Sequence, residues 1–109
     1  MLFRSLADEA YRLDPKNPGI ISTYAFALHL RGKTDEGIAL MRSLDEKQLF
    51  DPSAAAYFAA MLVEGPKPDE AAKYIAIAQT GKLLPEEVAL VKSAREKLIH
   101  GSARKASPQ

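Results

Sequence analysis

The sequence predicts an all-α fold in which antiparallel helix pairs stack side by side, with about six helices in total. Three observations lead to this prediction. The chain aligns with itself without gaps when it is shifted so that Pro18 falls on Pro52, and this displacement is its repeat period. Apolar residues recur at the three- and four-residue spacing of helices, and proline and glycine interrupt that spacing at intervals. A fixed period of this length is typical of repeat proteins, in which each unit buries its apolar face against a copy of itself.

Two copies of the repeat align along their whole length, residues 18–51 and residues 52–85. Large apolar residues align with large ones, and small residues align with small ones. The pairs are Pro18 with Pro52, Tyr24 with Phe58, Ala25 with Ala59, Leu28 with Leu62, Met41 with Ile75, and Asp35-Glu36-Gly37 with Asp69-Glu70-Ala71. Each copy is therefore expected to fold into the same pair of helices.

The first two helices are predicted over residues 2–13 and 19–31. The first helix has one apolar face at helical spacing, made of Leu2, Phe3, Leu6, Ala7, Ala10 and Leu13. The run from Asp14 to Gly19 contains two prolines and ends that helix, because proline lacks the amide that the helix needs for its hydrogen bonds. Gly32 is expected to end the second helix in the left-handed conformation, which glycine adopts at little cost.

The third and fourth helices are predicted to run from Thr34 to about Leu44 and over about residues 53–64. Thr34 is a candidate N-cap, and the acidic residues that follow it favour the positive end of the helix dipole. Residues 45–48 are polar and are expected to connect the two helices. The fourth helix is rich in alanine, which has the highest helix propensity and lets neighbouring helices approach closely.

The last two helices are predicted over residues 69–80 and 85–99. The final helix carries one apolar stripe and has polar residues on its other sides, so it can end the stack in water. Lys92 and Glu96 fall where the preceding copy carries large apolar residues. The repeat is therefore expected to break in this helix.

Composition argues against several classes of partner. The chain of 109 residues has a net charge of +1, which creates no strong field to attract nucleic acid or a membrane surface. Residues 90–109 carry most of the positive charge, with a net +4, and are expected to be solvated; a weak docking patch is the alternative. The sequence contains no cysteine, no apolar run of membrane-spanning length and no signal peptide at its start. A cytoplasmic location is the default expectation, provided that the chain is not a piece of a longer protein.

The period and the positions of the loops resemble those of tetratricopeptide repeats. The resemblance depends on small residues where the helices of each pair cross: Ala25 and Ala59 in the first helix, Gly37 and Ala71 in the second. It covers residues 18–85 as two full repeats. The chain departs from the family pattern at Ile21 and Ala55, which replace a tryptophan, at Leu49 and Leu83, which replace a closing proline, and at Phe3, which replaces a small residue.

The resemblance implies a right-handed α-α superhelix and a domain organisation that follows the repeats. A helical repeat domain is expected over residues 1–100. Within it, residues 1–17 hold the second helix of a preceding repeat, residues 18–51 and 52–85 are repeats, and residues 86–100 form a capping helix. Residues 101–109 lack an apolar pattern and are expected to be a disordered tail.

No residue pattern in the sequence indicates catalysis, a cofactor site or a metal site. His29 has no His, Asp or Glu three or four residues away on its helix. His100 lies near a helix C-terminus, where a cation interacts well with the dipole. The paired acidic residues each open a helix, and no glycine-rich phosphate loop is present. We therefore expect a protein that is not an enzyme and that uses no cofactor and no metal.

The family resemblance also implies a concave groove, lined by the first helix of each pair, that takes a partner's peptide or helix. Carried over by helical phase, the groove residues are Ser22, Thr23, Phe26, His29, Leu30, Ala56, Tyr57, Ala60, Val63 and Glu64. This lining is apolar to neutral, so it suits a hydrophobic or amphipathic helical ligand. The alternative is that Phe26, Tyr57 and Val63 only pack against the terminal helix.

The function expected from this pattern is a protein–protein interaction scaffold, part of a larger protein, that binds a peptide or an amphipathic helix. Neither nucleic acid nor a membrane is expected as a partner. The alternative function is self-association into a homodimer, because the first helix has an apolar face without a partner on its N-terminal side. The residues of that face are Leu2, Phe3 and Leu6.

Overall fold

The computed structural model describes residues 6–106, and the side chains of residue 6 and of residues 8–100. This part of the chain forms seven α-helices and one 3-10 helix and contains no strand, so the predicted all-α class is confirmed. The elements are α1 (Leu6–Leu13), α2 (Pro18–Leu30), α3 (Thr34–Met41), α4 (Glu46–Leu49), α5 (Pro52–Leu62), η1 (Pro68–Glu70), α6 (Ala71–Ala78) and α7 (Pro85–Ala106).

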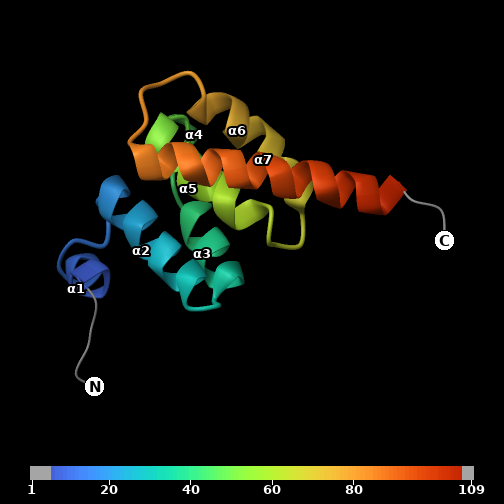
Figure 1. The fold of residues 1–109 in the computed structure, drawn as a ribbon. Coiled ribbons are helices and arrows are strands. Elements are labelled where there is room, and N and C mark those ends of the chain that lie inside the picture. Colours follow the sequence, from blue (N-terminus) through green and yellow to red (C-terminus); the bar gives the residue numbers. More distant parts are fainter. Residues whose placement is uncertain (1–5, 107–109) are drawn as a thin grey trace.

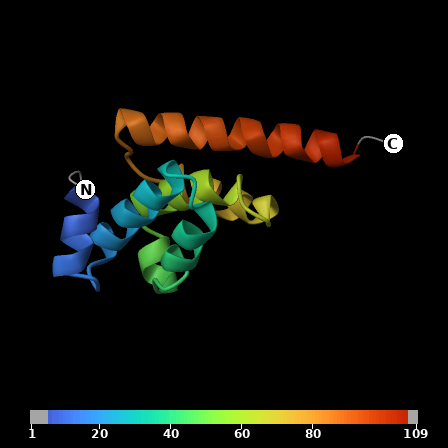
Figure 2. The same cartoon turned by 90° about the horizontal axis from the view of Figure 1, so that it is seen from below.

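The helices are arranged around α5. Helix α2 packs against α3, and α5 packs against α6, while α5 also contacts α2, α3, α4 and α7. Figure 1 shows α5 between the α2–α3 pair and α6, with α7 running across them. Figure 2 shows that α7 lies along one side of the other helices and that its C-terminal part extends beyond them.

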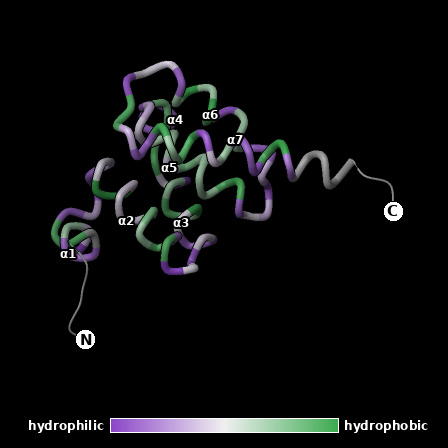
Figure 3. The backbone as a smooth tube through the Cα atoms, in the orientation of Figure 1, coloured by the Kyte–Doolittle hydropathy of each residue, from purple (hydrophilic) through white to green (hydrophobic). Residues whose placement is uncertain are grey.

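The apolar and small residues of α5 form the centre of the core. Phe58, Met61 and Leu62 are buried, as is Met41 of α3. The Phe58 ring contacts two side chains: its centroid lies 4.7 Å from that of Tyr74 and 5.7 Å from the Arg42 guanidinium. Figure 3 shows the hydrophobic residues along the packed helices, and hydrophilic residues at connections such as the turn between α2 and α3.

A glycine allows the close approach of α2 and α3. A Cβ atom added at Gly37 would lie 2.6 Å from the carbonyl oxygen of Ala25 and 3.0 Å from the sulfur of Met61. Ala25 is itself fully buried. In the second pair, Ala71 stands at the position of Gly37 and Ala59 at the position of Ala25, and both are fully buried. Small side chains therefore lie in the interior of both helix pairs.

The helix ends agree with the sequence analysis at some positions and differ at others. Gly32 has a φ of 86°, so the predicted left-handed end of α2 is confirmed. The prediction that Thr34 is an N-cap is wrong, because Thr34 is the first residue of α3 and the cap position is Lys33. The hydroxyl of Thr34 instead hydrogen bonds with Nδ1 of His29, at 2.9 Å.

Two helical segments were not expected from the sequence. The polar connection contains the short helix α4, in which the side chain of Gln48 accepts a hydrogen bond from the amide of Asp45. Helix α7 continues to Ala106 instead of ending near Ile99, so residues 101–106 are helical where a disordered tail was expected. The rest of that tail, residues 107–109, lies outside the described residues, as do Leu2 and Phe3.

Replacing Gly37 by alanine is predicted to destabilise the α2–α3 pair, because the added Cβ would force the two backbones apart. Overpacking costs about 1–3 kcal/mol, and the higher helix propensity of alanine offsets roughly 1 kcal/mol of that cost. Urea denaturation should therefore report a net loss of up to about 2 kcal/mol, whereas the control keeps only the gain in helix propensity. Gly19→Ala is the control, since its added Cβ meets no atom closer than 3.4 Å. Equal stability of the two variants would contradict the prediction.

Candidate functional site

A cavity lies between α2, α5 and α7, and equivalent positions of the three helices line it. Phe26, Ala60 and Ala94 follow one another along the chain at the same displacement that aligns Pro18 with Pro52, and all three line this cavity. The same spacing relates three further lining residues, which are His29, Val63 and Lys97. Leu30, Glu64, Leu90 and Ser93 complete the lining. The cavity has a volume of about 220 Å³.

Local interactions fix the helices that carry these side chains. The side chains of Asn17 and Asp51 accept hydrogen bonds from amides in the first turns of α2 and α5, and a proline begins each of these helices. At the start of α7, Oε1 of Glu87 accepts from the amide of Leu84 and from the hydroxyl of Ser53, each at 3.0 Å. Glu87 is only 3% exposed, so this buried carboxylate ties α7 to the first turn of α5.

Aromatic rings cluster on one part of the lining. The ring of Phe26 lies 5.0 Å from that of Tyr57 and 5.6 Å from that of His29. Burial raises the pKa of Tyr57 above its ordinary value, and the neighbouring carboxylate of Glu87 raises it further. The phenol is therefore held in its neutral form, which suits an apolar surface.

Charged side chains lie next to this aromatic cluster, with His29 common to both. Lys97 Nζ donates a hydrogen bond to Glu64 Oε2 at 2.5 Å, and Nε2 of His29 lies 4.0 Å from the same oxygen. The hydrogen bond from Lys97 holds the pKa of Glu64 below its usual value. The His29 side chain is only 10% exposed and also contacts Thr34. These polar groups are thus already paired with one another, which leaves the apolar lining residues as the surface that a ligand can use.

The structure brings together many of the predicted groove residues but not all of them. Phe26, His29, Leu30, Ala60, Val63 and Glu64 line the one cavity. Ser22 is buried and lines a separate pocket, and its hydroxyl donates to the carbonyl of Gly19. Thr23 lies in another pocket beside α1, Ala56 is fully buried, and Tyr57 packs on Phe26. The N-terminal half of α2, up to Thr23, therefore does not line the cavity.

The sequence analysis named no lining residue on α7, although it weighed packing of Phe26, Tyr57 and Val63 against that helix. Leu90, Ala94 and Lys97 line the cavity, although the repeat was expected to break in this helix. Lys92 and Glu96, the residues on which the expected break depended, are exposed. The inner side keeps the repeat period, and following that period past residue 85 would have found Ala94 and Lys97.

The candidate self-association face is described only at Leu6, whose side chain is 89% exposed. Leu6 lines a pocket with Ala10, Ile20 and Thr23 at the junction of α1 and α2. This pocket has a volume of about 450 Å³.

Among the described residues, no three or more His, Asp or Glu side chains gather in a way that could hold a metal ion. The described helices also include none that is both long enough and apolar enough to cross a membrane. Comparison of the chain with protein-family models, with curated proteins and with solved structures finds no match. The resemblance to tetratricopeptide repeats therefore remains a prediction from the sequence.

The raised pKa of Tyr57 predicts a loss of stability at alkaline pH. The unfolded chain releases the phenol proton at the ordinary value of 10.0, whereas the folded chain holds it to higher pH. The stability that the neutral Tyr57 phenol contributes is therefore complete below pH 10. It falls as the pH rises from there through the folded-state pKa. The free energy of unfolding, measured between pH 8 and pH 11 by urea titration, should fall less steeply in Tyr57→Phe than in the native chain. Tyr24→Phe, which leaves Tyr57 in place, is the control; an equal effect of both substitutions would contradict the assignment.

Proposed function

We propose that the chain is a tetratricopeptide-like interaction module, a right-handed superhelix whose concave side is the cavity between α2, α5 and α7. The observation that carries the proposal is the spacing of the lining residues: Phe26, Ala60 and Ala94 are separated by the same period that relates the two copies. The packing of α2 on α3 and of α5 on α6 also supports it, because it repeats one helix pair twice.

The proposed ligand is a peptide or an amphipathic helix that inserts an apolar side chain. The cavity volume of about 220 Å³ is below the roughly 300–1,000 Å³ of small-molecule pockets, so the site suits an anchoring side chain better than a cofactor. Leu30 is 70% exposed at the edge of the cavity and would extend the apolar contact beyond it. The helices that carry the lining residues are already held in place by their caps and by Glu87. Binding would therefore cost little conformational entropy. Binding by shape needs no reacting group, and the proposal therefore assigns no enzymatic activity.

Leu30→Asp is predicted to weaken peptide binding without unfolding the protein. A display library of helical peptides supplies the ligands, and fluorescence anisotropy measures the affinity of each selected peptide. A charge at Leu30 should weaken binding at least tenfold, because the apolar side chain of the ligand would have to desolvate it. Leu13→Asp is the matched control, since Leu13 is equally exposed, at 72%, but lies on α1. Equal affinity of the two variants for all selected peptides would exclude the cavity as the binding site.

Self-association through α1 is the second candidate function, favoured by the exposure of Leu6 beside the pocket at the α1–α2 junction. Light scattering should detect a dimer that is lost in Leu6→Asp and retained in Leu30→Asp. A monomer at all concentrations in the native chain would remove this candidate and leave the peptide-binding proposal intact.

A further inference from the structure

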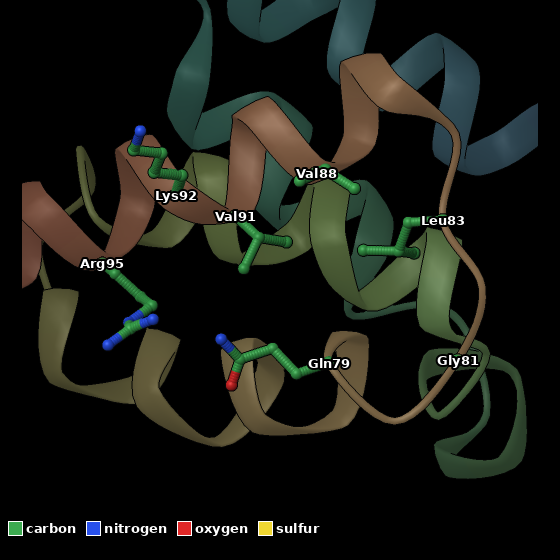
Figure 4. A pocket seen from close by; sticks show the side chains of 7 residues that line it. All are labelled: Gln79, Gly81, Leu83, Val88, Val91, Lys92 and Arg95. Atoms are coloured by element: carbon green, nitrogen blue, oxygen red, sulfur yellow. The ribbon is translucent and has the colours of Figure 1, made fainter.

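The α6–α7 seam, a groove formed by the facing sides of these two helices, is separate from the cavity of the proposed function. Two adjoining pockets make up the seam, of about 440 Å³ and 230 Å³, and both are lined by Gln79 and Arg95. Leu83, Val88 and Val91 line the first pocket, which Figure 4 shows. Leu98 and Ile99 line the second. The seam is thus apolar at both ends and polar in the middle.

The length of the seam favours a helix as its occupant. Along α7 it runs from Val88 to Ile99, which corresponds to about 17 Å or three helical turns. Val88 is 52% exposed and Ile99 is 59% exposed, so both ends are open to a partner. A ligand of this length with apolar groups at both ends matches one face of an amphipathic helix.

The side of α7 that carries Lys92 corresponds, by the repeat period, to the side of α5 that carries Phe58. Lys92 stands one repeat period after Phe58, and Phe58 packs against Tyr74 of α6. Helix α6 thus covers this side of α5. Lys92 is exposed, and the described part of the chain places no corresponding helix beside α7. A bound helix would occupy, relative to α7, the place that α6 occupies relative to α5.

The residues at the centre of the seam indicate which charge a bound helix should carry. In Figure 4 the side chains of Arg95 and Gln79 point toward the same space, while Lys92 extends from the other edge of α7. Within the part of the chain whose side chains are described, neither Arg95 nor Lys92 forms an ion pair. An arginine with free donors binds a carboxylate through two parallel hydrogen bonds, and a neighbouring amide can donate a third.

We propose that the α6–α7 seam binds an amphipathic helix of a partner protein in which an aspartate or glutamate stands between apolar residues. The carboxylate binds Arg95 and Gln79, and the apolar residues pack on Val88 and Val91 at one end and on Ile99 at the other. None of these residues lines the cavity between α2, α5 and α7, so the seam acts independently of that cavity.

The test uses a stapled helical peptide with leucines at i, i+3, i+8 and i+11 and one glutamate at i+4, so that its apolar contacts span the seam, together with a matched peptide that has glutamine at i+4. Titration of the isotope-labelled full chain, followed by NMR, should shift the signals of Gln79, Val88, Val91 and Arg95. Arg95→Gln should weaken the glutamate peptide about tenfold or more and leave the glutamine peptide nearly unchanged, because only the carboxylate gains from the guanidinium. Arg12→Gln, on α1, is the matched control and should change neither affinity.

Several results would overturn the proposal. One is the absence of shifts in the seam at millimolar glutamate peptide; another is equal weakening of both peptides by Arg95→Gln. Shifts confined to Phe26, Leu30 and Ala60 would assign the peptide to the other cavity. Concentration-dependent shifts of the seam without peptide would mean that a second copy of the chain covers it. Leu30→Asp should leave seam binding unchanged, so failure here is distinguishable from failure of the proposed function.

Discussion

The burial of α5 is the constraint on which the rest of the structure depends. This helix contacts α2, α3, α4, α6 and α7, so nearly every side of it is covered by protein. A helix that is covered on all sides must be apolar on all sides. It must also carry small side chains where its neighbours approach most closely. Its alanines meet the second condition, and Phe58, Met61 and Leu62 fill the remaining space. Both helix pairs, the cavity and the seam are built on elements that α5 or its partner α6 holds in place.

The sequence was sufficient to predict the helix pairs because their formation depends on local and periodic features. The positions of small residues indicate where the backbone turns, as at Gly32, and where helices approach closely, as at Gly37 and the alanines of α5. Helix α4 escaped prediction because a four-residue helix has no apolar period; its signal was polar, in the reciprocal capping of Asp45 and Gln48. The extension of α7 to Ala106 escaped prediction for another reason. Once a helix exists, each added residue gains a hydrogen bond without a new nucleation cost, so a segment without apolar pattern can continue it.

The candidate site was only partly predictable because helical phase places a residue on a face but not against a particular neighbour. The phase placed Phe26, His29, Leu30, Ala60 and Val63 correctly along one cavity. It failed for Ser22 and Thr23, because the N-terminal half of α2 lines other pockets. Glu87 shows a further limit: its position in the first turn of α7 indicated a dipole interaction, yet its carboxylate binds Ser53 on a different helix. Tertiary contacts of this kind leave no local pattern in the sequence.

Native-state hydrogen exchange of the full chain tests the central role of α5 most directly. If α5 holds the structure together, its amides from Ala56 to Leu62 should exchange only through global unfolding, with free energies equal to that measured by denaturation. The amides of α1 and of the part of α7 beyond Ile99 should exchange through smaller openings, because fewer helices cover them. Exchange of the α5 amides at free energies as low as those of α1 would contradict the account.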